Sequence, residues 1–251
     1  MDVLVGSTGY VGLTLSSKMK FDLAVNSSNA ENIRNIECDT LVCAAAPAEK
    51  WKANSQPLDD FRNILKIADL LGSVKANRVV LISTVDVYPQ PFAQDELDVV
   101  NPGIDLNYGC NRLLLEKFVE KTFSSSHIIR LPGLYSVGLK KNLIYDLIHR
   151  KDNQYKTIDP RSFFQYFDLE LIFEVFTFVI ENQIELLNVS VEPIEASSIA
   201  SLFGKSLSGE KYSHYDIYSK YAEAFGGAKK YLFNAEHSLA GISRLIKQIQ
   251  V

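Results

Sequence analysis

An apolar run followed directly by three evenly spaced glycines opens the chain. Residues 2–5 are Asp-Val-Leu-Val, and Gly6, Gly9 and Gly12 come next. In a strand–turn–helix unit this spacing allows a tight reversal, close approach of the backbone to a pyrophosphate, and close packing of the helix on the strand. The helix N-terminus then directs N–H groups and partial positive charge at the phosphates. The pattern predicts a dinucleotide-binding turn, although a glycine-rich turn can also be only a turn, and the residues expected to line it are Gly6, Thr8, Gly9, Tyr10, Val11 and Gly12.

Composition and charge narrow the class of protein. The 251 residues are 47% hydrophobic and 22% charged, which suits one large domain or a core domain with a small lobe. A net charge of −4 offers no basic surface for nucleic acid. The three cysteines and four histidines lack metal-ligand spacing, and the most apolar stretch, residues 171–180, is too short to span a bilayer. We therefore expect a cytoplasmic protein with no signal sequence, metal site, structural disulfide, membrane anchor or nucleic-acid partner.

Strand-like runs alternate with helical segments along the chain. The strand candidates are residues 2–5, 22–25, 40–45, 78–83, 127–131 and 186–189. Helices are expected over 57–71 and 108–123, the second with Leu113, Leu114, Phe118 and Val119 on its core side. This alternation predicts an α/β fold of the Rossmann type, a doubly wound parallel sheet that binds ligands at the carboxyl ends of its strands. The expected domains are a dinucleotide-binding domain over 1–135, with a returning segment at about 164–190, and a small C-terminal substrate lobe from 136–163 and 191–251.

A second candidate site follows the fourth predicted strand. Ser83 and Thr84 end that strand, and Tyr108 comes 24 residues after Thr84, with Arg112 four residues later. On a helix, Tyr108 and Arg112 share one face. A tyrosine, with an ordinary pKa of about 10, is a useful acid or base near neutral pH only if that pKa is lowered, and a fixed cation one turn away lowers it by favouring the phenolate. Thr84, Tyr108 and Arg112 are therefore catalytic candidates, although chance alone would give about one such Tyr–cation pair in a chain of this composition.

Taken together, these motifs resemble the extended short-chain dehydrogenase/reductase family, which includes nucleotide-sugar epimerases, dehydratases and keto-sugar reductases. The resemblance covers nearly the whole chain. The family's GxxGxxG motif matches the three glycines, its alanine-rich strand end is similar to residues 43–46, and Tyr108 matches its catalytic tyrosine. Residues 130–135, 164–168 and 187–193 are similar to its sixth strand, its aromatic–aspartate motif and its returning strand.

The resemblance implies roles for individual residues. Thr84 would hydrogen-bond the reacting oxygen, and Tyr108 would move the proton on it. Arg112 stands where the family has a lysine that lowers the tyrosine pKa and binds the nicotinamide ribose; arginine keeps the charge and the donors but is bulkier and planar. Further cofactor contacts are implied for Ala44, Ala45, Ala46, Asn63, Tyr108, Arg112 and Pro132.

The end of the second strand bears on the choice of cofactor. A site that prefers NAD usually carries a carboxylate about 20 residues after the first glycine, where it accepts the ribose hydroxyls. Here Asn26, Ser27 and Ser28 occupy that position, and Arg34 follows. These neutral donors favour NADP over NAD, although the same composition is also typical of a plain turn.

The substrate is less visible in the sequence. Lys140 and Asn142 could meet a diphosphate, and Asp86 lies close enough to Thr84 to shape a sugar site. The leading hypothesis is an NADP- or NAD-dependent oxidoreductase or epimerase that transfers hydride to or from a nucleotide-linked keto sugar; a dehydratase is disfavoured because Val85 follows Thr84 where that branch has an acidic residue. The alternative, which Arg112 keeps open, is a non-catalytic or weakly active dinucleotide-binding sensor of the same fold. A homodimer is one option for its assembly.

Overall fold

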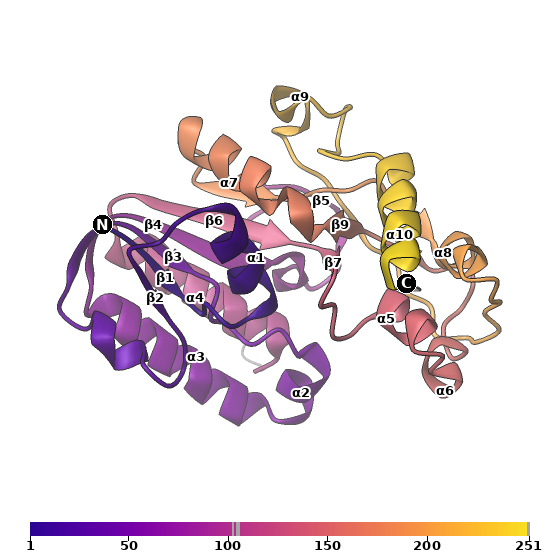
Figure 1. Ribbon diagram of the computed structural model, residues 1–251, viewed down its shortest axis with the longest axis horizontal. Helices are drawn as coiled ribbons and strands as arrows, with labels where there is room; N and C mark the ends of the chain where they lie inside the picture. Colours follow the sequence, from indigo (N-terminus) through magenta and orange to yellow (C-terminus); the bar gives the residue numbers. More distant parts are fainter. Residues whose placement is uncertain (102, 104–105, 250–251) are drawn as a thin grey trace. The chain divides into compact units, whose positions relative to one another are not determined.

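Two compact units make up the chain in the computed structural model, which describes residues 1–101, 103 and 106–249 (Figure 1). The first unit comprises Met1–Pro89, Val99–Arg130 and Leu171–Leu187, and the second comprises Gln90–Asp98, Leu131–Glu170 and Asn188–Val251. Four segments assigned to the first domain on sequence pattern fall in the second unit, namely 90–98, 131–135, 164–170 and 188–190.

A six-stranded parallel sheet forms the centre of the first unit, in the order β10-β6-β4-β3-β1-β2. All six predicted strands are confirmed, with bounds that differ by a few residues: β1 (Asp2–Val5), β2 (Leu23–Val25), β3 (Glu37–Cys43), β4 (Lys75–Thr84), β6 (Ser126–Leu131) and β10 (Leu186–Asn188). From β1 the chain passes to β2 on one side and then to β3 on the other, so the strand order reverses between β1 and β3. In sheets of this kind, ligands bind at such a switch point.

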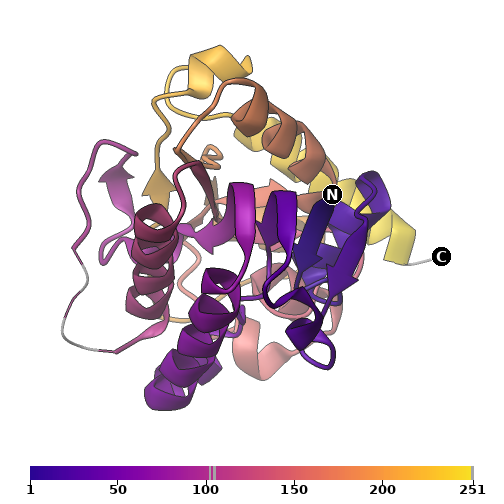
Figure 2. The same cartoon turned by 90° about the vertical axis from the view of Figure 1, so that its left-hand side faces the viewer.

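Helices cover both faces of this sheet. Figures 1 and 2 show α3 (Pro57–Gly72) and α4 (Tyr108–Thr122) on one face, with α1 (Tyr10–Lys18) and α7 (Ile172–Glu181) on the other. The short α2 (Lys50–Ser55) precedes α3 and contacts both α3 and α4. The Rossmann-type fold predicted from the alternation is therefore confirmed.

Apolar residues at helical spacing bury the inner faces of α3 and α4. On α3, Ile64, Ala68 and Leu71 enter the core with strand residues such as Val3 and Leu41, because residues three and four apart share one face. On α4, Leu113 and Val119 are buried, whereas Leu114 and Phe118 are only partly so. The same helix also buries Asn111, Arg112 and Glu116, a polar set that hydrophobic periodicity does not predict.

The second unit consists of short strand pairs and helices around its own core. Its strands pair as β5 (Phe92–Gln94) with β12 (Asp216–Ile217), β7 (Gly133–Tyr135) with β9 (Tyr166–Asp168), and β8 (Phe163–Phe164) with β11 (Ile194–Glu195). Its helices are α5 (Leu143–Ile148), α6 (Asp152–Tyr155), α8 (Ala196–Leu202), α9 (Ala222–Phe225) and α10 (Ala235–Ile249). Tyr135, Tyr155 and Tyr166 are buried in this core.

Two general features of the described residues bear on function. No described helix is both long and apolar enough to cross a membrane. No group of three His, Cys, Asp or Glu side chains arranged to hold a metal ion is found within residues 1–101, 103 and 106–249.

Candidate functional site

The glycine turn joins the end of β1 to α1 at the switch point. Gly6 has a φ of +91°, and a Cβ added to it would lie 2.6 Å from the carbonyl carbon of Ala44. A Cβ on Gly12 would lie 2.1 Å from the Gly6 carbonyl oxygen. Both positions therefore require glycine, the first for its left-handed backbone and the second for the close approach of α1 to the turn.

The same turn exposes helix N–H groups at this edge of the sheet. Gly9 is the N-cap of α1, and the first turn of the helix carries no acidic residue. The first N–H groups of a helix have no intrahelical acceptor and attract phosphate. Thr8 is exposed, Tyr10 and Val11 are half-buried, and Ala44, Ala45 and Ala46 are half-buried at the end of the neighbouring strand β3. These residues fit a dinucleotide, because small side chains and open N–H groups surround the turn.

A structured turn without a carboxylate follows β2. The Asn26 Oδ1 accepts hydrogen bonds from the Ser28 N–H at 2.9 Å and the Ser28 Oγ at 2.7 Å, and Ser27 and Ser28 are exposed. Arg34 forms ion pairs with Glu31 at 2.5 Å and Asp69 at 2.8 Å. The segment is therefore a turn stabilised by the Asn26 side chain. It also presents neutral donors at the position where a carboxylate would exclude a 2′-phosphate.

Thr84 and Tyr108 meet at the carboxyl end of β4. The side chain of Thr84 lies beside the Tyr108 hydroxyl and lowers its pKa, and the Thr84 Oγ1 accepts the Asp86 N–H at 3.1 Å. After accepting the Asp86 N–H, the Thr84 hydroxyl keeps its own proton for donation to another oxygen. Gly109 allows this contact, because a Cβ there would lie 2.0 Å from the Asp86 carbonyl oxygen.

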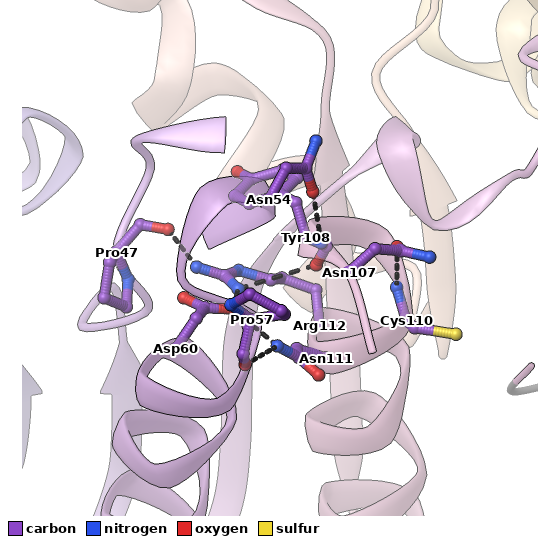
Figure 3. A network of polar contacts seen from close by, with 9 residues as sticks. All are labelled: Pro47, Asn54, Pro57, Asp60, Asn107, Tyr108, Cys110, Asn111 and Arg112. Carbon is purple, nitrogen blue, oxygen red and sulfur yellow. Dashed lines mark hydrogen bonds and ion pairs between the residues drawn. The ribbon is translucent and has the colours of Figure 1, made fainter. Parts of the chain in front are cut away.

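Two asparagine side chains fix the start of α4 (Figure 3). The Asn107 Oδ1 caps the helix by accepting the Cys110 N–H at 3.0 Å, and the Asn54 Oδ1 of α2 accepts the Tyr108 N–H at 2.9 Å. Both contacts satisfy N–H groups that a helix start otherwise leaves without partners. The Tyr108 backbone is therefore held from two sides.

Arg112 lies beneath the ring of Tyr108 and is only 2% exposed. Its guanidinium carbon is 4.2 Å from the centroid of that ring. The Nη1 donates to Asp60, the Nη2 donates to the Pro47 carbonyl oxygen, and no described residue accepts from the buried Nε (Figure 3). The side chain thus contacts the face of the tyrosine ring, and two of its three nitrogens are committed to protein acceptors.

The charge balance around Tyr108 differs from the sequence expectation. Burial raises the pKa of the Tyr108 hydroxyl, and Asp86 raises it further, while Arg112, Thr84 and Lys50 lower it. The net pKa lies above the ordinary value. Arg112 acts in the predicted direction, but removal of the phenolate from water outweighs it, so Tyr108 is a neutral phenol near neutral pH.

Asp60 is the site residue that the sequence did not reveal. It is 6% exposed, and besides Arg112 it accepts the Asn111 Nδ2 at 2.7 Å. Asn63, predicted to support the site from the same helix, is exposed. Residue spacing could have predicted that Asp60 is buried. Asp60 precedes Ile64 by four residues and so continues the buried face of α3 by one more turn.

Ser83 belongs to a separate buried cluster. Its Oγ donates to Glu116 at 2.5 Å, and Glu116 forms an ion pair with Arg130 at 2.6 Å. Arg130 also lies over the ring of Tyr88, 4.9 Å from its centroid. Of the two hydroxyls at the end of β4, Ser83 is therefore committed to Glu116, and Thr84 is the one that acts on Tyr108.

The three residues predicted to contact substrate have different local settings. Asp86, in the first unit, has a side chain 18% exposed and binds the Lys50 Nζ at 2.7 Å. Asn142, in the second unit, caps α5 by accepting the Tyr145 N–H at 3.0 Å and donates to the Leu134 carbonyl at 2.8 Å. Lys140 is exposed, and Pro132, predicted to contact cofactor, is buried in the same unit. Asn142 therefore has a structural role of its own.

Several solved structures share this fold. MoeE5 in complex with UDP-glucuronic acid and NAD matches with a TM-score of 0.77 at 17% identity, over 100% of this chain and 99% of that chain. UDP-glucose 4-epimerase from Thermotoga maritima with UDP-glucose gives 0.74 at 13% identity, over 100% and 99%. dTDP-4-dehydrorhamnose reductase from Bacillus anthracis in complex with NADP gives 0.67 at 16% identity, over 98% of each chain. No protein-family model and no curated protein matches the sequence.

Proposed function

We propose that the protein is an NAD(P)-dependent oxidoreductase or epimerase acting on a nucleotide-linked keto sugar, with Tyr108 as the proton-transfer residue. The observation that carries the proposal is the placement of Thr84 beside the Tyr108 hydroxyl at the end of β4, in the same sheet whose β1–β3 switch point carries the glycine turn. A dinucleotide turn alone binds a cofactor. A tyrosine beside a threonine at the same edge of the sheet adds a group that can act on a substrate oxygen.

In this proposal the glycine turn and the N–H groups of α1 hold the pyrophosphate, and Ala44, Ala45 and Ala46 leave room for the nucleotide beside them. The bound nicotinamide supplies a hydride donor or acceptor. Thr84 holds the sugar oxygen, and Tyr108 gives or takes its proton. Arg112 fixes the ring of Tyr108, and its unpartnered Nε leaves a donor for a ribose hydroxyl.

The protonation state of Tyr108, a neutral phenol near neutral pH, favours one direction. A neutral phenol is a proton donor, so it suits reduction of a carbonyl, whose oxygen must gain a proton as its carbon is reduced. Epimerisation needs the same residue to act as base in one half of the reaction. We therefore favour reduction of a keto sugar over epimerisation as the proposed activity.

Neighbouring structures support the substrate class without establishing it. Those named above hold UDP-glucuronic acid and NAD, UDP-glucose, or NADP. For the cofactor, the neutral turn at Asn26 favours NADP, while the ion pairs of Arg34 with Glu31 and Asp69 reduce the charge it could offer a 2′-phosphate.

A second candidate function is a dinucleotide sensor without catalysis. The commitment of Arg112 to Asp60 and Pro47 favours it, because a side chain held in this way differs from a compact ammonium that contacts a ribose. The two functions share the cofactor turn and differ only in the use of Tyr108.

The deciding experiment measures NADPH and NADH oxidation by the purified protein on a panel of UDP-, dTDP- and GDP-linked keto sugars. We expect turnover with at least one sugar, and a loss of about 10²-fold or more in Tyr108→Phe with cofactor binding retained. The matched control is Tyr212→Phe at an exposed tyrosine, which should keep full activity. Tight cofactor binding without turnover on any sugar would favour the sensor, and full activity in Tyr108→Phe would remove Tyr108 from the mechanism.

A further inference from the structure

A second cation lies near Tyr108, on the short helix that follows β3. Lys50 begins α2, and its Nζ is 2.7 Å from the Asp86 Oδ1. The Lys50 side chain is 46% exposed and that of Asp86 is 18% exposed, so the pair is partly shielded from water. The sequence motifs around Thr84 and Tyr108 do not include Lys50.

Contacts on both sides of this pair lead to the Tyr108 hydroxyl. The Asp86 N–H donates to the Thr84 Oγ1, and Thr84 lies beside the Tyr108 hydroxyl and lowers its pKa. One turn after Lys50 on the same helix, Asn54 accepts the Tyr108 N–H. Helix α2 therefore bears on Tyr108 through its backbone and, by way of Asp86 and Thr84, through its hydroxyl.

We infer that Lys50 is a positioning residue for Tyr108: by binding Asp86 it holds the turn that orients Thr84, and it adds a second cation to that of Arg112, which contacts the face of the ring. The role of Lys50 in catalysis rests on the proposed function. Its effect on the pKa of Tyr108 does not, because that effect can be measured on the protein without substrate.

The charged groups around Tyr108 determine whether a substitution at Lys50 raises or lowers the pKa of its hydroxyl. Arg112 on α4 and Lys50 on α2 favour the phenolate, Asp86 disfavours it, and Asp60 on α3 is paired with Arg112. Loss of the Lys50 charge removes one favourable cation and takes away the positive charge that Lys50 places beside Asp86. Both changes act in the same direction, so Lys50→Met should raise the pKa of Tyr108, whereas Asp86→Asn should lower it.

The first test needs no substrate. Ionisation of Tyr108 is followed as the ultraviolet phenolate signal that is lost in Tyr108→Phe, for the full-length protein and its variants. We expect Lys50→Met to shift the Tyr108 transition upward by about half a unit or more, and Lys50→Arg to restore it. Lys52→Met is the matched control, because Lys52 lies on the same helix, 56% exposed, and is paired with Glu49 at 3.9 Å. An unchanged transition in Lys50→Met, or in Asp86→Asn if the lysine variant does not fold, overturns the inference.

The second test measures the kinetics of keto-sugar reduction. Lys50→Met should lower kcat by roughly three- to tenfold with little change in KM for NADPH, and Lys50→Arg should recover most of the loss. The two tests separate the claims. If no keto sugar is reduced by the wild-type protein, the proposed function fails, while the ionisation data still decide whether Lys50 acts on Tyr108.

Discussion

Arg112 and Asp60 form an ion pair in which the two side chains are only 2% and 5% exposed. The pair joins α4 to α3, and Arg112 also reaches the Pro47 carbonyl and stacks on Tyr108. A planar, forked guanidinium can make all three contacts at once, whereas a compact ammonium on a flexible stem cannot. The structure thus gives a physical reason for arginine at this position.

Asp60→Asn should be strongly destabilising. The substitution leaves the Arg112 charge buried without its counter-charge, and breaking a buried pair in this way costs about 3–5 kcal/mol. Urea unfolding followed by circular dichroism measures the change in free energy. The control is Asp59→Asn on the same helix, whose pair with Arg62 at 2.9 Å is exposed and should contribute less than about 1 kcal/mol. Equal losses in the two variants would contradict the structural importance of the buried pair.

Arg112→Lys, the residue that the resembled family carries, should lower both stability and activity. Lysine can keep the charge beside Asp60 but loses the Pro47 contact or the stacking on the tyrosine ring, with an expected cost of about 1–3 kcal/mol. Thermal unfolding and keto-sugar turnover are the two measurements. A large gain of activity would show instead that arginine impairs an older lysine site.

Gly12→Ala and Gly9→Ala should separate folding from cofactor binding. A Cβ on Gly12 meets the Gly6 oxygen at 2.1 Å, so the alanine variant should lose about 3 kcal/mol of stability as well as NADPH binding. On Gly9 the nearest atom is the Gly6 carbonyl oxygen at 3.3 Å, a tight contact that a small backbone shift relieves, so that variant should lose less stability than Gly12→Ala. It should still bind NADPH more weakly, because this position approaches the pyrophosphate. Fluorescence titration together with urea unfolding tests both, and a Gly9→Ala protein with unchanged NADPH affinity would argue against a pyrophosphate at the turn.

Asn26→Asp should shift the choice of cofactor toward NADH. The new carboxylate would repel a 2′-phosphate and accept ribose hydroxyls. We expect NADPH affinity to fall by about tenfold and NADH affinity to hold or rise, as measured by nicotinamide fluorescence. Tighter NADH than NADPH binding in the unmodified protein would contradict the preference for NADP.

The reduction rate should stay flat toward alkaline pH. A proton donor works while it is protonated, and its contribution is lost only as pH rises through its pKa. Because burial raises the pKa of Tyr108 above its ordinary value, kcat/KM should show no alkaline decline before about pH 9. A decline centred near neutral pH, in protein shown to remain folded, would contradict a neutral, buried phenol.

The sheet could be predicted from the sequence because its signals are local. Apolar runs of strand length fixed all six strands of the first unit, and the glycine spacing placed the turn at the β1–β3 switch point. Helical periodicity found α3 and α4 to within a residue at each end. Each of these signals depends on residues a few positions apart, where backbone geometry sets the spacing.

The pairing of Thr84 with Tyr108 was predictable only through family resemblance, and the setting of that pair was not predictable at all. Asp60, Lys50 and Pro47 come from segments that lie far from Tyr108 in sequence, and no local pattern marks an aspartate or a lysine as a partner of a distant side chain. The sequence alone determined the strands, the turn and the presence of a tyrosine with a cation one helical turn away. Only the tertiary structure decided that the cation stacks on the ring and pairs with Asp60, and that burial outweighs it in setting the pKa of Tyr108, because desolvation and charge pairing depend on which distant groups converge in space.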